Sequence, residues 1–478
     1  MDMGRTAAIR LAGIAVVVTA AVVASQPAVF EHTADRGADR TPPATANGAA
    51  TPHSETIHKS VVLSKTPDEP GRIDATVTYD IPDSVTELSV SPPNRTTRVS
   101  ASGFDPSTDG YEWTGRQDAP TLRITVTANQ SAAAPPNDER HQAGEYSFVD
   151  AGDWALVTVP TVRTSWRWSD ADDVSVSVSE SVSVDGPGAT GGEIAYLGPV
   201  IERTRTAHGQ TITLVTPERA GLVEPPAAIL DTVTAAAGRL QVGGRDDHVW
   251  LLAAPRAPLL GPRGVEYGGS DAWVGADERL NTATNVWLHE YVHTRQAYDT
   301  TASARWTIEA TAQYYAALLS LRLNATTNDA FRRTIAKGAD EPWRSAVLST
   351  PETWAVGANY RKGALVWGAL DRRVRGATDR TADGQAVLRR LNDREQPVSN
   401  ADVVAAVAAA GDDDAAAATK RDTTSPTAPS MWPPTARPAP LDSPAGSTPI
   451  GQPARGPLPP LNGALAPVAT TTATAHHR

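Results

Sequence analysis

The chain has 478 residues, of which 40% are hydrophobic, so it is long enough for two or three domains and can bury a substantial core. Its net charge of −11 argues against nucleic acid or an anionic membrane surface as a partner. Because the sequence contains no cysteine, it has no disulfide, no thiolate zinc site and no cysteine nucleophile.

The first thirty residues predict an export signal. Arg5 and Arg10 supply positive charge before an apolar run over residues 11–24, and small and polar residues follow that run. This order is typical of a cleavable signal peptide. Apolar residues continue to Phe30, so the segment also approaches the roughly 20 residues that a membrane anchor needs. Both interpretations place the rest of the chain outside the cytoplasm, either extracellular or anchored at the cell surface.

Two regions of different character follow the export signal. Residues 31–55 are rich in Ala, Thr, Pro and Gly without a hydrophobic period, which predicts a flexible linker. From 56 to 215, short alternating runs separated by turn residues predict a β-rich, sandwich-like domain. The clearest of the predicted strands cover residues 73–79, 88–90, 122–126, 154–159 and 174–184.

The pattern changes near residue 216, where hydrophobic residues adopt helical spacing. The predicted helices cover residues 225–240, 283–298, 306–323, 331–336, 360–374 and 403–410, and a strand covers 249–253. The chain is therefore predicted to be α+β, with a mostly helical domain over residues 216–410. The Asp-, Ala-, Thr- and Pro-rich residues 411–478 cannot bury enough apolar surface to offset the entropy of ordering, so they are predicted to be disordered.

The sequence WLHEYVH at residues 287–293 contains the pattern HExxH. On a helix, His289 and His293 lie one turn apart on the same face, so both imidazoles can reach one ion. Neutral imidazole suits Zn²⁺. Glu290, next to the first ligand, can accept a proton from a zinc-activated water and pass it to a leaving amine. The alternative interpretation is a surface helix with two idle histidines.

A catalytic zinc needs three protein ligands and one open position. Glu309, on the next predicted helix, is the candidate third ligand, and Asp299 is a rival that follows His293 by only six residues. Gln313, one turn after Glu309, is a candidate for orienting a ligand histidine. We therefore expect one zinc ion per chain. The alternative interpretation of Glu309 and Gln313 is that both are ordinary polar residues on the solvent-facing side of a helix.

The run HEYVH followed by RWTIEATAQYY resembles the zinc peptidases with two His and one Glu as ligands, the gluzincins. It is most similar to the glycyl aminopeptidase family and its aminopeptidase N relatives, which implies a thermolysin-like catalytic domain. Upstream, GVEYGGS at 264–270 resembles the edge-strand motif of these enzymes. The resemblance implies that Glu266 binds the α-amino group of the substrate and that the strand from Gly264 pairs with the peptide. A Gly-rich turn with one acid is the alternative.

Downstream, NYRKGALV at 359–366 resembles the family's Tyr-x-Lys-Gly-Ala helix start. The resemblance implies that Tyr360 stabilises the oxyanion, which a phenol near a metal can do by donating a hydrogen bond. A half-buried Tyr near a helix start is the alternative. The chain departs from the family in the spacing between His293 and Glu309, in Ala310 where a Gly is usual, and in Tyr267 where close relatives carry His.

The leading hypothesis is an exported zinc peptidase that hydrolyses peptide bonds of peptide or protein substrates and is aminopeptidase-like. If Glu266 does not bind an amine, the enzyme is an endopeptidase. Two further hypotheses remain: a non-catalytic surface binding protein that retains the fold, and a zinc hydrolase acting on another bond, because HExxH specifies the activated water and not the acyl group.

Overall fold

The computed structural model describes residues 53–66, 68–93, 95–128, 130–131, 148–169, 174–256 and 262–429. The predicted export signal, nearly all of the predicted linker and the tail beyond residue 429 lie outside these ranges, so those predictions remain predictions. In the part of the chain that the structure describes, no helix combines the length and the apolar character needed to cross a bilayer.

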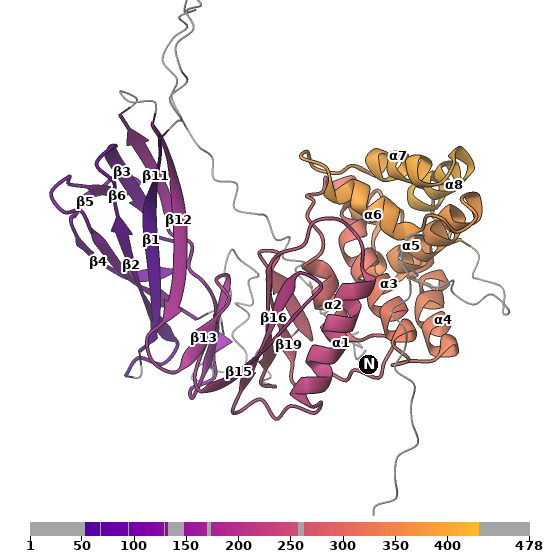
Figure 1. Ribbon diagram of the computed structural model, residues 1–478, viewed down its shortest axis with the longest axis horizontal. Helices are drawn as coiled ribbons and strands as arrows, with labels where there is room; N and C mark the ends of the chain where they lie inside the picture. The colour runs from indigo at the N-terminus through magenta and orange to yellow at the C-terminus, as the bar shows by residue number, and fades with distance from the viewer. Residues whose placement is uncertain are drawn as a thin grey trace, which may run out of the picture. The chain divides into compact units, whose positions relative to one another are not determined.

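The first part of the described chain contains two sheets that share one hydrophobic core (Figure 1). In β2 (Arg72–Asp80), alternate residues from Ile73 to Tyr79 are fully buried, as expected for a strand with one face on a core. The five-stranded sheet has the order β12 (Val174–Val184), β1 (His53–Lys65), β2, β7 (Thr121–Thr127), β4 (Thr96–Ser102). The four-stranded sheet has the order β11 (Arg163–Trp168), β3 (Val85–Ser91), β6 (Gly110–Trp113), β5 (Phe104–Ser107). These paired sheets form the predicted sandwich-like arrangement.

Two further sheets pack on each other through a smaller apolar cluster that includes Tyr196, Trp250 and Trp273. One has the order β13 (Gly188–Thr190), β14 (Ile194–Leu197), β10 (Ala155–Thr158), β9 (Phe148–Asp150), β8 (Gln130–Ser131). The other has the order β15 (Val200–Ala207), β16 (Gln210–Pro217), β17 (His248–Ala254), β19 (Asp271–Gly275), β18 (Gly264–Tyr267). In the second of these, β18 is an edge strand that pairs antiparallel with β19.

The predicted domain boundary between residues 215 and 216 falls inside β16. Because β16 pairs with β17, the sheet next to the helices begins at Val200, earlier than the sequence predicts. β15 and β16 are strands like those before them, so no change from strand to helix marks the start of this sheet.

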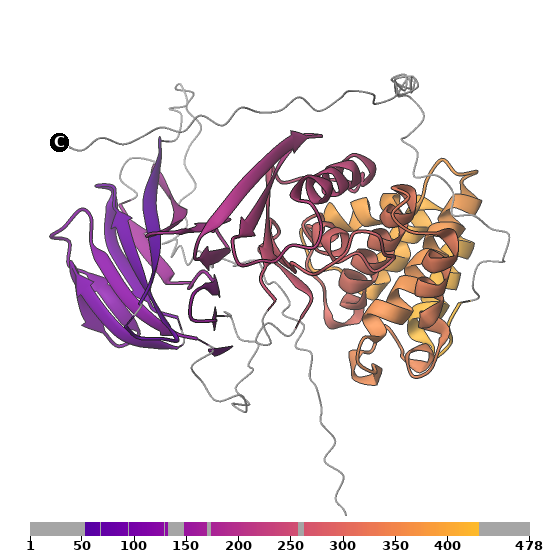
Figure 2. The same cartoon turned by 90° about the horizontal axis from the view of Figure 1, so that it is seen from below.

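The helices follow, and the first two of them lie against the other face of that second sheet, in a core shared by β16, β17, β19 and the helices (Figure 2). They are α1 (Pro226–Arg239), α2 (Val286–His293), α3 (Trp306–Arg322), α4 (Asn328–Ala336), α5 (Ala358–Ala377), α6 (Gly384–Asn392), α7 (Asn400–Ala410) and α8 (Asp413–Thr424). Short 3-10 turns cover Ala302–Ala304, Lys337–Ala339, Trp343–Ser345 and Pro351–Thr353. The mixed α+β architecture predicted from the sequence is confirmed.

Two helical predictions need correction. The helix predicted at 283–298 is shorter, because Asn285 caps α2 by accepting a hydrogen bond from the Leu288 N–H (3.1 Å) and the helix ends at His293. The disorder predicted from residue 411 is wrong for α8, which Asp412 caps through the Ala415 N–H. Buried small side chains of α8, such as Ala415 and Thr419, pack against the rest of the helical region, which composition does not reveal.

Candidate metal centre

Helix α2 holds the HExxH residues against the core. Trp287, Leu288 and Tyr291 are buried in the core of the helical region. His289 and His293 lie one turn apart, with Nε2 atoms 3.1 Å from each other. The apolar positions of this short helix therefore fix its rotation and direct both imidazoles to the same point.

Glu309, in the first turn of α3, completes a three-donor cluster with the two histidines, as the sequence predicts. Its Oε2 lies 3.2 Å from His289 Nε2 and 3.4 Å from His293 Nε2. Zinc bonds of about 2.0–2.1 Å in tetrahedral geometry place ligand atoms about 3.3 Å apart. The observed triangle matches this spacing, so the residues fit a zinc ion. Asp299, the rival ligand, does not belong to this cluster.

The charges around the cluster favour a cation at its centre. Burial alone would lower the pKa of His293, but the carboxylates of Glu309, Glu290 and Glu266 raise it to about 10. Burial acts to raise the pKa of Glu309, but His293 and His289 hold it well below its ordinary value. Carboxylates that surround the two imidazoles in this way favour a positive charge at the centre of the cluster.

Gln296, and not Gln313, contacts a ligand histidine. Its Oε1 lies 2.9 Å from Nδ1 of His293. Gln313 is half-buried on α3 and, among the described residues, makes no hydrogen bond to His289 or His293. The only sequence signal for Gln296 is its position three residues after His293, which does not reveal where the chain turns after the helix.

Glu290 lies between the cluster and strand β18. The backbone N–H of Glu266 donates a hydrogen bond to the Glu290 carboxylate, and a Cβ at Gly264 would lie only 2.7 Å from Glu290 Oε1. Gly264 is therefore needed for this close approach. Burial is the main cause that raises the pKa of Glu290 to about 8, and the nearby Glu309 and Glu266 add to it.

The carboxylate of Glu266 lies close enough to influence both Glu290 and His293, since it raises the pKa of each. Its Oε1 also accepts a hydrogen bond from the Gly269 N–H in the turn between β18 and β19. This turn fixes the side chain near the cluster, at the edge of the sheet. The structure thus brings Gly264 and Glu266 to the predicted metal ligands.

Tyr360, in the first turn of α5, contacts the cluster from another side. Its ring stacks on His289, with centroids 5.8 Å apart and planes 11° apart, and its hydroxyl hydrogen-bonds to Glu309. Burial, with the negative charge of Glu309, raises the pKa of Tyr360 far above its ordinary value, so the phenol stays neutral. The close approach of α5 to α3 depends on Gly363, where a Cβ would lie 2.8 Å from the Ala310 Cβ.

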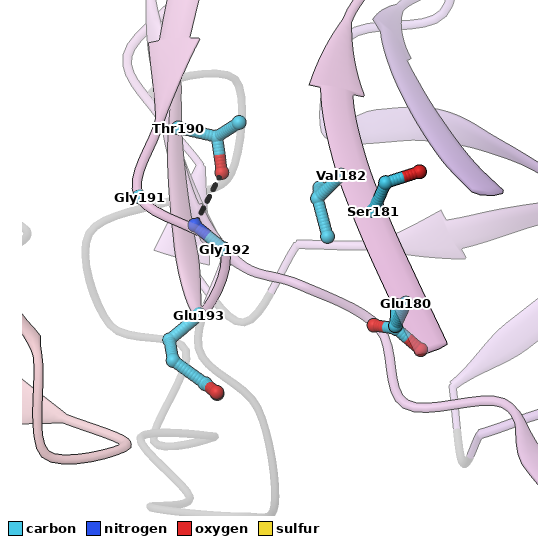
Figure 3. Close-up of a pocket in the computed structure, with 7 residues that line it drawn as sticks. All are labelled: Glu180, Ser181, Val182, Thr190, Gly191, Gly192 and Glu193. Carbon is cyan, nitrogen blue, oxygen red and sulfur yellow. Dashed lines mark hydrogen bonds between the residues drawn. The ribbon is translucent and has the colours of Figure 1, made fainter. Parts of the chain in front are cut away.

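A separate hollow lies in the β-rich part of the chain (Figure 3). It is lined by Glu180, Ser181 and Val182 of β12 and by residues 190–193. Lys59 already pairs with Glu180. The hollow includes none of the predicted site residues.

Comparison with known proteins gives a fold. No protein-family model matches the chain, and no curated protein matches it in sequence. A variant of the M1 zinc metallopeptidase of Deinococcus radiodurans, solved with the substrate Tyr-Ser-Ala, matches over 80% of this chain and 96% of its own, at 16% identity and a TM-score of 0.51. A second structure of such a variant from this organism matches over the same shares at 17% identity and a TM-score of 0.50.

The chain shares its fold with M1 zinc metallopeptidases. At such low identity the likeness concerns the fold, and the argument for chemistry rests on the site's own geometry. Of the predicted site residues, the structure brings together the residues His289, Glu290, His293, Glu309, Tyr360, Glu266 and Gly264. It adds Gln296, which the sequence did not indicate, and it shows Gly363 and Ala310 packed against each other.

Proposed function

We propose that this chain is an exported zinc-dependent peptidase with a thermolysin-like catalytic domain, and that it removes residues from the free amino termini of peptides or proteins. The observation that carries the proposal is the donor triangle of His289, His293 and Glu309 at zinc spacing, with Glu290 beside it. The fold shared with M1 zinc metallopeptidases supports it. The triangle would hold one zinc ion per chain, and the N-terminal segment would export or anchor the protein.

Glu290 is the proton carrier in this proposal. When bound, zinc supplies Lewis acidity for the scissile carbonyl and lowers the pKa of the attacking water. The Glu290 carboxylate, held by the Glu266 N–H, takes a proton from that water and delivers it to the nitrogen of the leaving amine.

Tyr360 stabilises the negative charge that develops on the carbonyl oxygen. Its phenol is neutral across the physiological range and therefore donates a hydrogen bond. The stack on His289 and the contact with Glu309 direct the hydroxyl at the cluster before substrate arrives.

Glu266 selects a free amino terminus. Its carboxylate lies on β18, which is the edge strand of its sheet among the described residues. An extended peptide can add to such an edge by pairing with the strand backbone. Gly264 contributes only backbone there, because a side chain would collide with Glu290. An ammonium group bound by Glu266 places the first peptide bond next to the cluster.

The experiment compares peptides with free and N-acetylated termini, using full-length zinc-loaded protein and the variant Glu266→Gln. We expect release of the first residue from free peptides only, and a KM raised roughly tenfold or more in the variant. Glu202→Gln, an exposed carboxylate on the opposite edge strand β15, is the matched control and should leave KM unchanged. Internal cleavage of acetylated peptides at the same rate would assign an endopeptidase, and no cleavage at all would favour the binding protein.

A further inference from the structure

Gln296 makes three hydrogen bonds that join the two ligand-bearing helices. The chain turns tightly after α2, where the Gln296 N–H donates to the His293 carbonyl (3.0 Å). This turn returns the Gln296 side chain to His293, with Oε1 2.9 Å from Nδ1. Its Nε2 donates to the Ile308 carbonyl (2.8 Å) and to Thr311 Oγ1 (2.5 Å), on either side of Glu309 in α3.

The direction of these bonds follows from the chemistry of the amide. The Ile308 carbonyl can only accept, so the Gln296 nitrogen faces α3 and the Gln296 oxygen faces His293. An oxygen at Nδ1 requires a proton on Nδ1. When the imidazole is neutral, its lone pair is therefore on Nε2, the atom that faces His289 and Glu309.

The two histidines are supported differently. His289 is held by the stack on Tyr360, and among the described residues no hydrogen bond reaches its Nδ1. His293 depends on Gln296 for both its tautomer and its ring orientation. A carboxylate at position 296 would accept from His293 as well, but it could not donate to Ile308 and Thr311.

We propose that Gln296 is a positioning residue that selects the metal-binding tautomer of His293 and ties this ligand to Glu309, so that all three donors stand at zinc spacing before the ion binds. The inference rests on the proposed zinc site, but it assigns a role to a residue outside the HExxH pattern. Groups that orient a ligand imidazole typically change metal affinity by about 10- to 100-fold when they are removed.

The test measures the zinc dissociation constant of the full-length protein by competition with a chromophoric chelator. We expect Gln296→Ala to raise this constant by about 10- to 100-fold. The matched control is Gln313→Ala, the half-buried glutamine of α3 that contacts neither histidine, and it should bind zinc like wild type. In cobalt-loaded protein, the d–d absorption of Gln296→Ala should differ from wild type, because the His293 ring is free to turn.

A second variant keeps the test decisive if Gln296→Ala does not fold. Thr311→Val removes one acceptor of Gln296 while keeping the shape of a fully buried side chain, so zinc affinity should fall by less than in Gln296→Ala. If Gln296→Ala or Thr311→Val keeps wild-type zinc affinity and an unchanged cobalt spectrum, the role proposed for Gln296 is overturned but the proposed function is not. A folded wild type that binds no zinc would overturn the proposed function as well.

Discussion

The sandwich and the helical region bury different kinds of side chain. Among the described residues before Val200, the buried charged side chains are Lys59 and Asp150, and both are satisfied by backbone groups or a salt bridge. The helical region buries Glu290, Glu309 and many other charged groups. Buried ionisable groups with displaced pKa values are typical of functional sites. The buried carboxylates of the proposed site therefore lie in the helical region and not in the sandwich.

The largest expected effect is on catalysis, at Glu290. Glu290→Gln keeps the shape of the side chain but removes its proton-accepting oxygen, so the peptide hydrolysis rate should fall by about 10²- to 10⁴-fold. Zinc content should stay at the wild-type value, because Glu290 is not one of the three donors. Steady-state kinetics and metal analysis on the same sample check both statements, and a rate close to wild type would disprove the role of Glu290.

A core deletion in the sandwich sharpens the comparison. Leu122→Ala should lower the free energy of unfolding by about 2–5 kcal/mol, because Leu122 is fully buried in the sandwich core. Zinc affinity should not change, since that core is separate from the core around α2. Leu288→Ala is the matching core deletion in the helical region. Because Leu288 is next to His289, this variant should lower both the free energy of unfolding and the zinc affinity. Zinc titration and urea unfolding of both variants make this comparison. Equal losses of zinc affinity would show that the two cores are not independent in supporting the site.

Lys362 predicts a pH dependence that belongs to the helical region. It is fully buried and donates to the carbonyls of Arg344, Ala346 and Ser425, and burial lowers its pKa from 10.5 to about 8. Below pH 8 the folded state carries the full penalty of a buried charge. Between about pH 8 and 10.5 the unfolded state binds more protons, so the free energy of unfolding should rise with pH, by of the order of 3 kcal/mol.

Lys362→Met removes this contribution. Denaturant unfolding across that pH range should show a smaller rise for Lys362→Met than for wild type. The exposed Lys337 lies in the same region, and Lys337→Met should follow the wild-type curve. Parallel curves for wild type and Lys362→Met would contradict the assignment of the penalty to Lys362.

The smallest expected effect is at the contact between α3 and α5. Gly363→Ala places a methyl group 2.8 Å from the Ala310 Cβ and should cost about 1–3 kcal/mol of stability. Because α5 carries Tyr360, kcat should fall while zinc content is kept. Gly376→Ala, on the same helix with no atom near its Cβ position, should instead be neutral or slightly stabilising. A Gly363→Ala protein with wild-type kcat would show that the contact between Gly363 and Ala310 does not determine the position of Tyr360.

Short-range patterns were sufficient to locate the centre of the site. The i, i+4 spacing of His289 and His293 depends only on helix geometry, and Glu309 lies in the first turn of the next predicted helix. Tyr360, Glu266 and Gly264 came from resemblance to a family, and the structure brings all three to the cluster. These residues could be found because each depends on a few neighbours in the chain.

The remaining features depend on tertiary contacts. Gln296 is placed by the turn after α2 and by the start of α3, neither of which has a sequence signature. Helix α6 begins with Gly384 and spans nine residues, too short for a clear period. Helix α8 is rich in Ala and Asp, and its burial becomes visible only once its packing is known. The β15–β16 hairpin belongs to the sheet next to the helices through a pairing that no local pattern encodes.

Zinc content tests the central claim most directly. Mass-spectrometric metal analysis of wild type and His293→Ala, both checked for folding by circular dichroism, should find about one zinc per wild-type chain and almost none in the variant. A well-folded wild type that stays free of zinc after supplementation, or a His293→Ala protein that keeps its zinc, would contradict the account.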